Sequence, residues 1–279
     1  METRELHILG HGRMAVATRN TCAERFAAAV THEGRALAGG AALRRGARAI
    51  TLILAVPDRV LEGVAAAASP SLRAGDVVLH LAGMRGPDAL DAARASGASL
   101  GSLHPLAAVS SPSERADLRD RAFVFEGDDD AHAEVLRMLG DAGATVHRAS
   151  TVHRAGYHAA AALVATGAVA LAQGASAMFS EVMSPAPSDR AQREMVASLL
   201  RSVADNVARD GAWAALASPL RRHDTGAVAS HLDAMSPRPR VAAMYAAALE
   251  QVLDALEARR ELPPEVLAAA REVVRARAG

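Results

Sequence analysis

Apolar positions in the first half of the chain form short runs that alternate with segments of helical spacing. Each run has the length and the Ile, Leu and Val content of a buried strand. The expected strands are Leu6–Leu9, Ala27–Thr31, Ala49–Ala55, Asp76–Leu81, Ser99–Leu103 and Phe123–Phe125. Helices are expected at about 13–25, 35–45, 58–68, 87–96 and 131–139. Alternating units of this kind predict an α/β fold, a doubly wound parallel sheet with helices on both faces.

After about residue 148 the apolar positions follow only a helical period. The expected helices cover 151–181, 187–209, 224–235, 238–259 and 264–277. Ser-Pro and Pro-Pro pairs separate several of them, and proline is favoured in the first turn of a helix. The sequence therefore predicts a Rossmann-like domain over residues 1–148, followed by an all-α domain over residues 149–279.

A glycine motif follows the first expected strand. The segment from Gly10 to Ala15 reads G-x-G-x-x-A and leads into a helix, which is the order that a dinucleotide site needs. Gly10 allows a tight turn, and Gly12 lets the backbone approach a pyrophosphate at the helix N-terminus. His11, Arg13 and Met14 complete the candidate cofactor-binding turn. The alternative is a glycine turn that closes a βα unit without binding a ligand.

The identity of the cofactor depends on two charged residues about twenty positions later. Glu33 lies where an acidic side chain binds the ribose hydroxyls of NAD, whereas Arg35 suits the 2′-phosphate of NADP. Both are equally compatible with an exposed loop. Val56, Pro57 and Gly83 end two later strands, and ligands of doubly wound sheets bind at the carboxyl ends of strands. We expect these three residues to face the nicotinamide.

Composition excludes several kinds of chemistry. The formal net charge is zero, so nothing in the overall charge attracts nucleic acid or an anionic membrane. No lysine occurs, which excludes a lysine acid or base, a Schiff base and a Walker-type phosphate lysine. No metal-ligand motif is present, and Asp128–Asp130 is expected to cap the helix that follows it.

Two features bear on where the protein works. Cys22 is the only cysteine and no signal peptide is recognisable, so a cytoplasmic protein is expected. The apolar segment 159–171 is shorter than the roughly 20 residues of a membrane span, and it is expected to be a buried, closely packed helix.

Two histidines are candidates for proton exchange near neutral pH. His104 follows an expected strand, and His158 begins the first helix of the all-α domain. Thr166 lies eight residues after His158, and so on roughly the same helix face. A purely structural role is the alternative for each histidine.

Several segments together resemble one family of bacterial Rossmann-like proteins, whose helical C-terminal domain has no known function. The matching segments are Gly10–Ala15, Ala55–Asp58, His80–Gly83, Gly101–Leu106, Tyr157–Ala160 and Ser218–Asp224, together with Val228, His231 and Leu232. These proteins are distant relatives of ketopantoate reductase, pyrroline-carboxylate reductase and 6-phosphogluconate dehydrogenase. The resemblance implies an NAD(P)-dependent reductase, a homodimer formed through the helical domain, ketopantoate as a candidate substrate and Asp224 as a substrate-binding residue.

The chain departs from the family's pattern at several polar positions. Alanine stands at Ala82, Ala165 and Ala217, where the pattern has a polar side chain, and His223 replaces a glycine. These changes suit a less polar substrate or a protein that no longer turns over.

We therefore expect an NAD(P)H-dependent reductase of a small carbonyl or imine. The cofactor would be NADP(H), with NAD(H) as the alternative. His104 or His158 would supply a proton or an electrophilic hydrogen bond, while Thr166 and Asn206 position the substrate. One alternative is a non-catalytic dinucleotide-binding sensor or scaffold. Another is a dimerisation module with a ligand-free Rossmann domain.

Overall fold

The computed structural model describes residues 4–32, 43, 46–110 and 116–277. The chain divides into two compact units, Met1–Leu163 and Val164–Gly279. The first unit contains all the described strands, and the second contains only helices and their connections. Glu33 and Arg35 lie outside the described residues.

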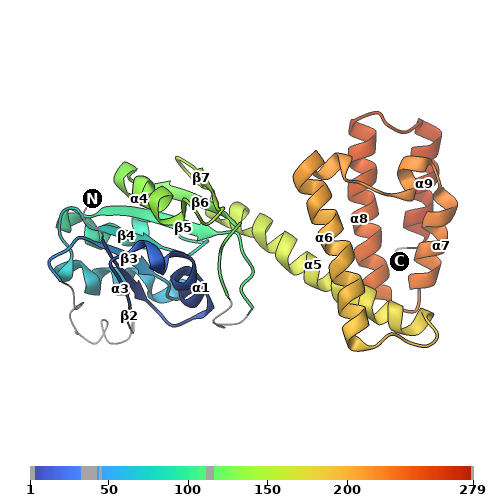
Figure 1. Ribbon diagram of the computed structural model, residues 1–279. Coiled ribbons are helices and arrows are strands. Elements are labelled where there is room, and N and C mark those ends of the chain that lie inside the picture. Colours follow the sequence, from blue (N-terminus) through green and yellow to red (C-terminus); the bar gives the residue numbers. More distant parts are fainter. Residues whose placement is uncertain (1–3, 33–42, 44–45, 111–115, 278–279) are drawn as a thin grey trace. The chain divides into compact units, whose positions relative to one another are not determined.

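A seven-stranded sheet forms the centre of the first unit (Figure 1). Its strands are β1 Glu5–Leu9, β2 Ala28–His32, β3 Ile50–Leu54, β4 Val77–His80, β5 Ser99–Pro105, β6 Ala122–Gly127 and β7 Thr145–Arg148, in the order β2-β1-β3-β4-β5-β6-β7. Strands β1 to β5 are parallel. Because the chain runs from β1 to β2 and returns to β3 on the other side of β1, the strand order reverses between β1 and β3. A doubly wound sheet binds its ligand at this topological switch point.

Helices cover both faces of the sheet. The first face packs against α1 Arg13–Cys22 and α4 Asp129–Leu139, and its core includes Leu6, Ile8 and Phe125. The second face packs against α3 Leu61–Ala68 and the 3₁₀ helix η4 Pro87–Ser96. Strand β3 is fully buried, as its Ile-Thr-Leu-Ile-Leu sequence predicts for a central strand covered on both faces.

The far edge of the sheet departs from the expected parallel arrangement. Strand β6 pairs antiparallel to β5, and β7 is an additional four-residue strand parallel to β6. Strand β7 has the sequence Thr-Val-His-Arg, which contains no apolar run from which a strand could be predicted. It is largely exposed at the edge of the sheet. The expected side-chain cap of α4 is also not formed. Asp128 occupies the N-cap position, but its carboxylate accepts the Leu100 N–H at 2.8 Å and makes no cap hydrogen bond.

The second unit is a helical bundle whose helices lie close to their expected positions (Figure 1). They are α5 Arg154–Val182, which begins in the first unit, α6 Asp189–Ala214, α7 Thr225–Met235, α8 Pro239–Ala258 and α9 Pro264–Arg277. Helix α6 is kinked at Gly211, whose φ of 82° is not helical. A core that includes Leu232, Leu253 and Val274 joins α7, α8 and α9.

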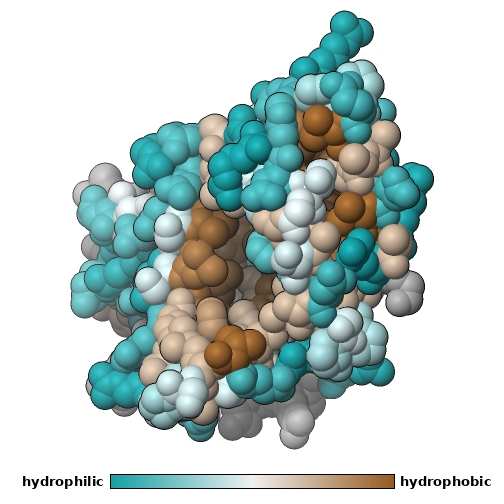
Figure 2. All heavy atoms as spheres, turned by 90° about the vertical axis from the view of Figure 1, so that its right-hand side faces the viewer, coloured by the Kyte–Doolittle hydropathy of each residue, from teal (hydrophilic) through white to brown (hydrophobic). Residues whose placement is uncertain are grey.

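The expectation that segment 159–171 is buried within the chain is wrong. Helix α5 is exposed there, with Leu163 at 75% and Val164 at 73% of their full exposure. Its later part packs closely at the buried Gly174, where a Cβ would lie 3.3 Å from the Val241 side chain of α8. Helix α5 is long and apolar enough to cross a membrane by length and composition alone. Apolar side chains also reach the surface of the face drawn in Figure 2, between polar ones.

Candidate functional site

The glycine turn joins β1 to α1 at the topological switch point. Gly10 has a φ of 126°, and a Cβ there would collide with the backbone carbonyl of Ala55, directly after β3. Its N–H donates to the His32 carbonyl at 3.0 Å, which ties the turn to the end of β2. Gly12, by contrast, faces open space. The first glycine is therefore required by the fold, whereas the second leaves room beside the backbone.

The N-terminus of α1 is available to an anion. Gly12 is its N-cap, no side chain caps it, and its first turn carries no acidic residue. Uncapped N–H groups and the positive end of the helix dipole favour a phosphate at such a position. His11 and Arg13 are exposed beside this turn, and Met14 is half-buried against the core. These residues fit the pyrophosphate of a dinucleotide.

The loops after β3 and β4 continue the same edge of the sheet. Val56 and Pro57 follow β3, and Gly83 is buried after β4. His80 fixes the loop that carries Gly83, because its Nε2 lies 2.8 Å from the Gly86 carbonyl and its Nδ1 accepts the Ala82 N–H at 3.2 Å. Burial lowers the pKa of His80 to about 4, so it is a neutral structural group near pH 7.

His104 and His158 meet over Gly83. A Cβ at Gly83 would lie 2.8 Å from both His104 Nε2 and His158 Cδ2, so only glycine lets the two rings approach this backbone. The ring centroids of the two histidines are 6.1 Å apart. His104 is half-buried near the end of β5, and His158 is exposed in the first turns of α5. The structure thus brings together the two histidines that the sequence singles out.

Tyr157 is the residue that the sequence analysis missed. Its hydroxyl lies 2.7 Å from His104 Nδ1, and the two rings meet edge to face. Burial raises the pKa of Tyr157, and the Arg154 charge opposes that rise. Burial, together with the charges of His158 and Arg154, lowers the pKa of His104 to about 4 against the opposing charge of Asp58. His104 is therefore neutral near pH 7, which excludes a resting imidazolium as its proton-donating form.

Arg154 holds the start of α5 against the sheet. Its guanidinium forms an ion pair with Glu126 of β6 and lies 3.3 Å from the Ser102 hydroxyl of β5. Both charged side chains are largely buried, at 14% and 15% exposure. A cavity of about 350 Å³ opens beside this pair, lined also by Met84, Arg85, Gly86, Asp88 and Val152. A small molecule has room there, next to the loop that carries Gly83.

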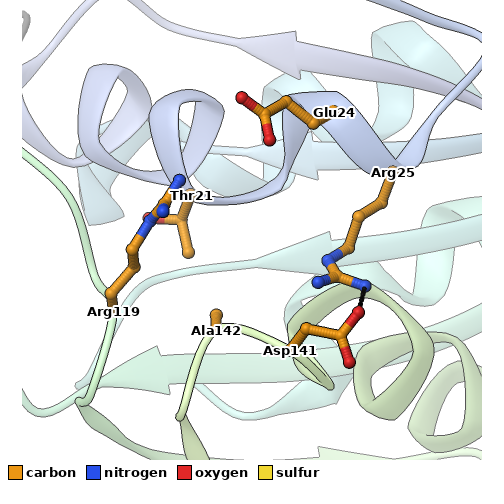
Figure 3. Close-up of a pocket in the computed structure, with 6 residues that line it drawn as sticks. All are labelled: Thr21, Glu24, Arg25, Arg119, Asp141 and Ala142. Atoms are coloured by element: carbon orange, nitrogen blue, oxygen red, sulfur yellow. Dashed lines mark ion pairs between the residues drawn. The ribbon is translucent and has the colours of Figure 1, made fainter.

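A second cavity of about 390 Å³ lies elsewhere in the first unit (Figure 3). Thr21, Glu24, Arg25, Arg119, Asp141 and Ala142 line it. The ion pair between Arg25 and Asp141, 2.7 Å long, spans one side. Its lining charges balance, and none of these residues belongs to the glycine turn or the histidine cluster.

The expected substrate-binding residues Thr166, Asn206 and Asp224 belong to the second unit. Thr166 is exposed on α5, and the Asn206 side-chain oxygen accepts a hydrogen bond from Arg209 at 2.8 Å. Asp224 caps α7 through the Ala227 N–H at 2.9 Å. Asp224 therefore has a structural role of its own, and the substrate contacts of all three remain predictions. Among the described residues, no group of three or more His, Cys, Asp or Glu is placed to hold a metal ion.

Comparisons with known proteins agree with this architecture. Residues 121–252 match a family described as a domain of unknown function, DUF2520. Protein TM1727 from Thermotoga maritima is 19% identical and has a TM-score of 0.56, over 97% of this chain and 98% of that one. Protein BF3122 from Bacteroides fragilis is 16% identical, with a TM-score of 0.60 over 88% and 95% of the two chains. No curated protein matches.

Pyrroline carboxylate reductase from Plasmodium falciparum, whose crystal structure contains NADP, is also similar. It is 11% identical, with a TM-score of 0.52 over 99% of this chain and all of that one. At such identities the likeness shows the fold alone. It confirms the expected Rossmann-like domain followed by a helical region.

Proposed function

We propose that the protein is an NAD(P)H-dependent reductase of a small carbonyl or imine. One observation carries the proposal. The glycine turn follows β1 at the topological switch point, and the His104–His158 cluster lies over Gly83 after β4, at the same edge of the sheet with only β3 between the two strands. A dinucleotide bound along that edge would have its pyrophosphate at Gly12 and its nicotinamide toward Gly83. The solved NADP complex of a structurally similar reductase supports the same class of cofactor.

The cofactor would supply the hydride, and the protein would supply position, shielding and a proton. Gly10 fixes the turn, and Gly12 leaves space for the pyrophosphate. Gly83 keeps the backbone close to His104 and His158, whose polar ring atoms then lie near the reacting group. Arg154 holds α5 against the sheet, so that the helix carrying His158 stays in register with β5.

The proposal is tested in two steps. First, NADPH and NADH are titrated against the protein and the nucleotide fluorescence is recorded. Second, small ketones, aldehydes, 2-keto acids including ketopantoate, and cyclic imines are screened for loss of NADPH absorbance. Binding with turnover of at least one compound supports the reductase. Tight binding without turnover of any compound favours the non-catalytic alternative, and no binding refutes both.

A further inference from the structure

Resting on the proposed reductase function, we propose that Tyr157 and His104 form one proton-donating pair. The pair delivers its proton to the oxygen or nitrogen of the substrate as the hydride reaches carbon. The phenol comes from the first turn of α5, the imidazole comes from the end of β5, and 2.7 Å separates the hydroxyl from Nδ1. His104 Nε2 faces the backbone of Gly83, where the substrate and the nicotinamide would meet.

A count of protons explains why the pair can donate near neutral pH. Burial raises the pKa of Tyr157 and lowers that of His104 to about 4, so the phenol keeps its proton and the imidazole is neutral. A neutral imidazole still carries one N–H. The pair therefore holds two protons between about pH 5 and about pH 9, which follows from these directions of shift. One lies between the hydroxyl and Nδ1, and the other is free to leave from the phenol or from Nε2.

Reduction of the substrate needs one hydride and one proton, and the pair supplies the proton. Hydride adds to the carbonyl or imine carbon, and the π electron pair moves to the oxygen or nitrogen. That atom takes the proton, which leaves the pair with one negative charge shared across the remaining hydrogen bond. Arg154 lies three residues before Tyr157 on α5, and its positive charge favours the ionised phenol. Solvent then returns a proton to the pair.

The charged groups around the pair argue against an imidazolium donor. His158 and Arg154 both oppose a positive charge on His104, and only Asp58 favours one. A protonated His104 would therefore form only below about pH 4. His158 is exposed, whereas the hydrogen bond between the phenol and His104 joins two half-buried side chains.

The chain contains its own control. A second pair, Tyr245 and His231, lies in the helical unit with 3.0 Å between the hydroxyl and Nδ1. Its rings are tilted with centroids 5.9 Å apart, and burial raises the pKa of Tyr245 too. These are the only two tyrosines of the chain. Tyr245→Phe therefore removes the same chemical group from the same kind of hydrogen bond, in the other unit of the chain.

The first experiment needs no substrate. Absorbance titration of Tyr245→Phe reports the ionisation of Tyr157 alone, and comparison with Tyr157→Phe confirms the assignment. Proton NMR of wild type against His104→Gln identifies the His104 resonance and its midpoint. We expect the phenol to stay protonated through pH 9 and His104 to stay neutral above about pH 5. A phenol that ionises below about pH 8, or a His104 midpoint at 6.5 or above, overturns the pair as donor.

The second experiment uses the compounds reduced in the screen. Tyr157→Phe should lower kcat by about 10²–10⁴-fold, with unchanged NADPH affinity, because the proton donor is lost while the ring remains. Tyr245→Phe should keep the wild-type kcat. The wild-type kcat should stay level between about pH 5 and about pH 9, whereas an imidazolium donor would make it fall above about pH 6.5.

The outcomes separate this inference from the proposed function. If Tyr157→Phe keeps the full kcat, or if the two Tyr→Phe variants lose equal activity, the pair is not the proton donor. The proposed reductase function would still stand. A wild type that reduces no compound overturns both.

Discussion

Replacing Gly12 with valine tests the cofactor site most directly. Gly12 is exposed, a Cβ there meets nothing within 4 Å, and the backbone is extended, with φ −71° and ψ 173°. Valine adopts this conformation readily. The substitution therefore fills the space in front of the α1 N-terminus without disturbing the packed core.

The expected magnitudes differ widely between binding and stability. Hydrogen bonds to a charged group contribute roughly 1.5–3 kcal/mol each, so displacing a pyrophosphate from two N–H groups costs about 3 kcal/mol or more. That is a loss of about 100-fold or more in NADPH affinity. Valine is a poorer N-cap than glycine, and this should lower the free energy of unfolding by about 1 kcal/mol at most.

NADPH affinity is measured by fluorescence titration, and stability by urea unfolding. Gly63→Val is the matched control, since Gly63 is exposed on α3 and a Cβ there also meets nothing within 4 Å. It should bind NADPH like the wild type. An unchanged dissociation constant in Gly12→Val would refute the assignment of the pyrophosphate site, and an equal loss in both variants would point to a non-specific effect.

Three further predictions concern cofactor choice, assembly and pH. Arg35→Ala should weaken NADPH binding and leave NADH binding unchanged; a wild type that prefers NADH, with Glu33→Ala weakening it, would reverse this assignment. The protein should be a homodimer at micromolar concentration by light scattering, because the apolar surface of α5 over 159–171 is exposed in one chain; a monomer would contradict this. The pKa of His80 is lowered from 6.5 to about 4 by burial, so the unfolded chain binds its proton first as the pH falls. Titration of His80 should therefore lower stability by roughly 3 kcal/mol between pH 6.5 and pH 4. In urea unfolding, His80→Gln should lose this part of the drop and keep the part that comes from His104, whose pKa is also lowered to about 4.

The sequence predicted the parallel part of the sheet and the described α-helices of the second unit because local periodicity determines them, but not the short 3₁₀ helix Pro219–Arg222. The helix expected at 264–277 matches α9, which spans Pro264–Arg277. Local periodicity does not encode the direction of a strand or the identity of its neighbour. The antiparallel pairing of β6 and the short strand β7 depend on contacts across the sheet edge. The exposure of α5 likewise depends on which partners reach it, and an apolar composition alone predicts burial.

In the candidate site, too, features set by consecutive residues could be predicted and features set by distant contacts could not. The glycine turn is visible in the sequence because strand, turn and helix are consecutive, and the roles of Gly10 and Gly12 follow from their order. Tyr157 was missed because its contact with His104 joins positions 53 residues apart. Its position directly before His158, in a chain with only two tyrosines, was the available signal. The lowered pKa of His104 was also inaccessible, since it arises from burial and from the charges of His158 and Arg154.

The surroundings of Ala82 show what is lost where alanine replaces the polar side chain of the family's pattern. Its side chain is 9% exposed and packs in the core beneath α3 and η4, while its N–H donates to His80. A hydroxyl there would face that apolar core and add nothing to the groups around Gly83. The polar groups at the cluster come from other positions, His104, Tyr157 and Arg154. The alanine at position 82 therefore removes no proton donor, and it gives no support to the non-catalytic alternative over the reductase.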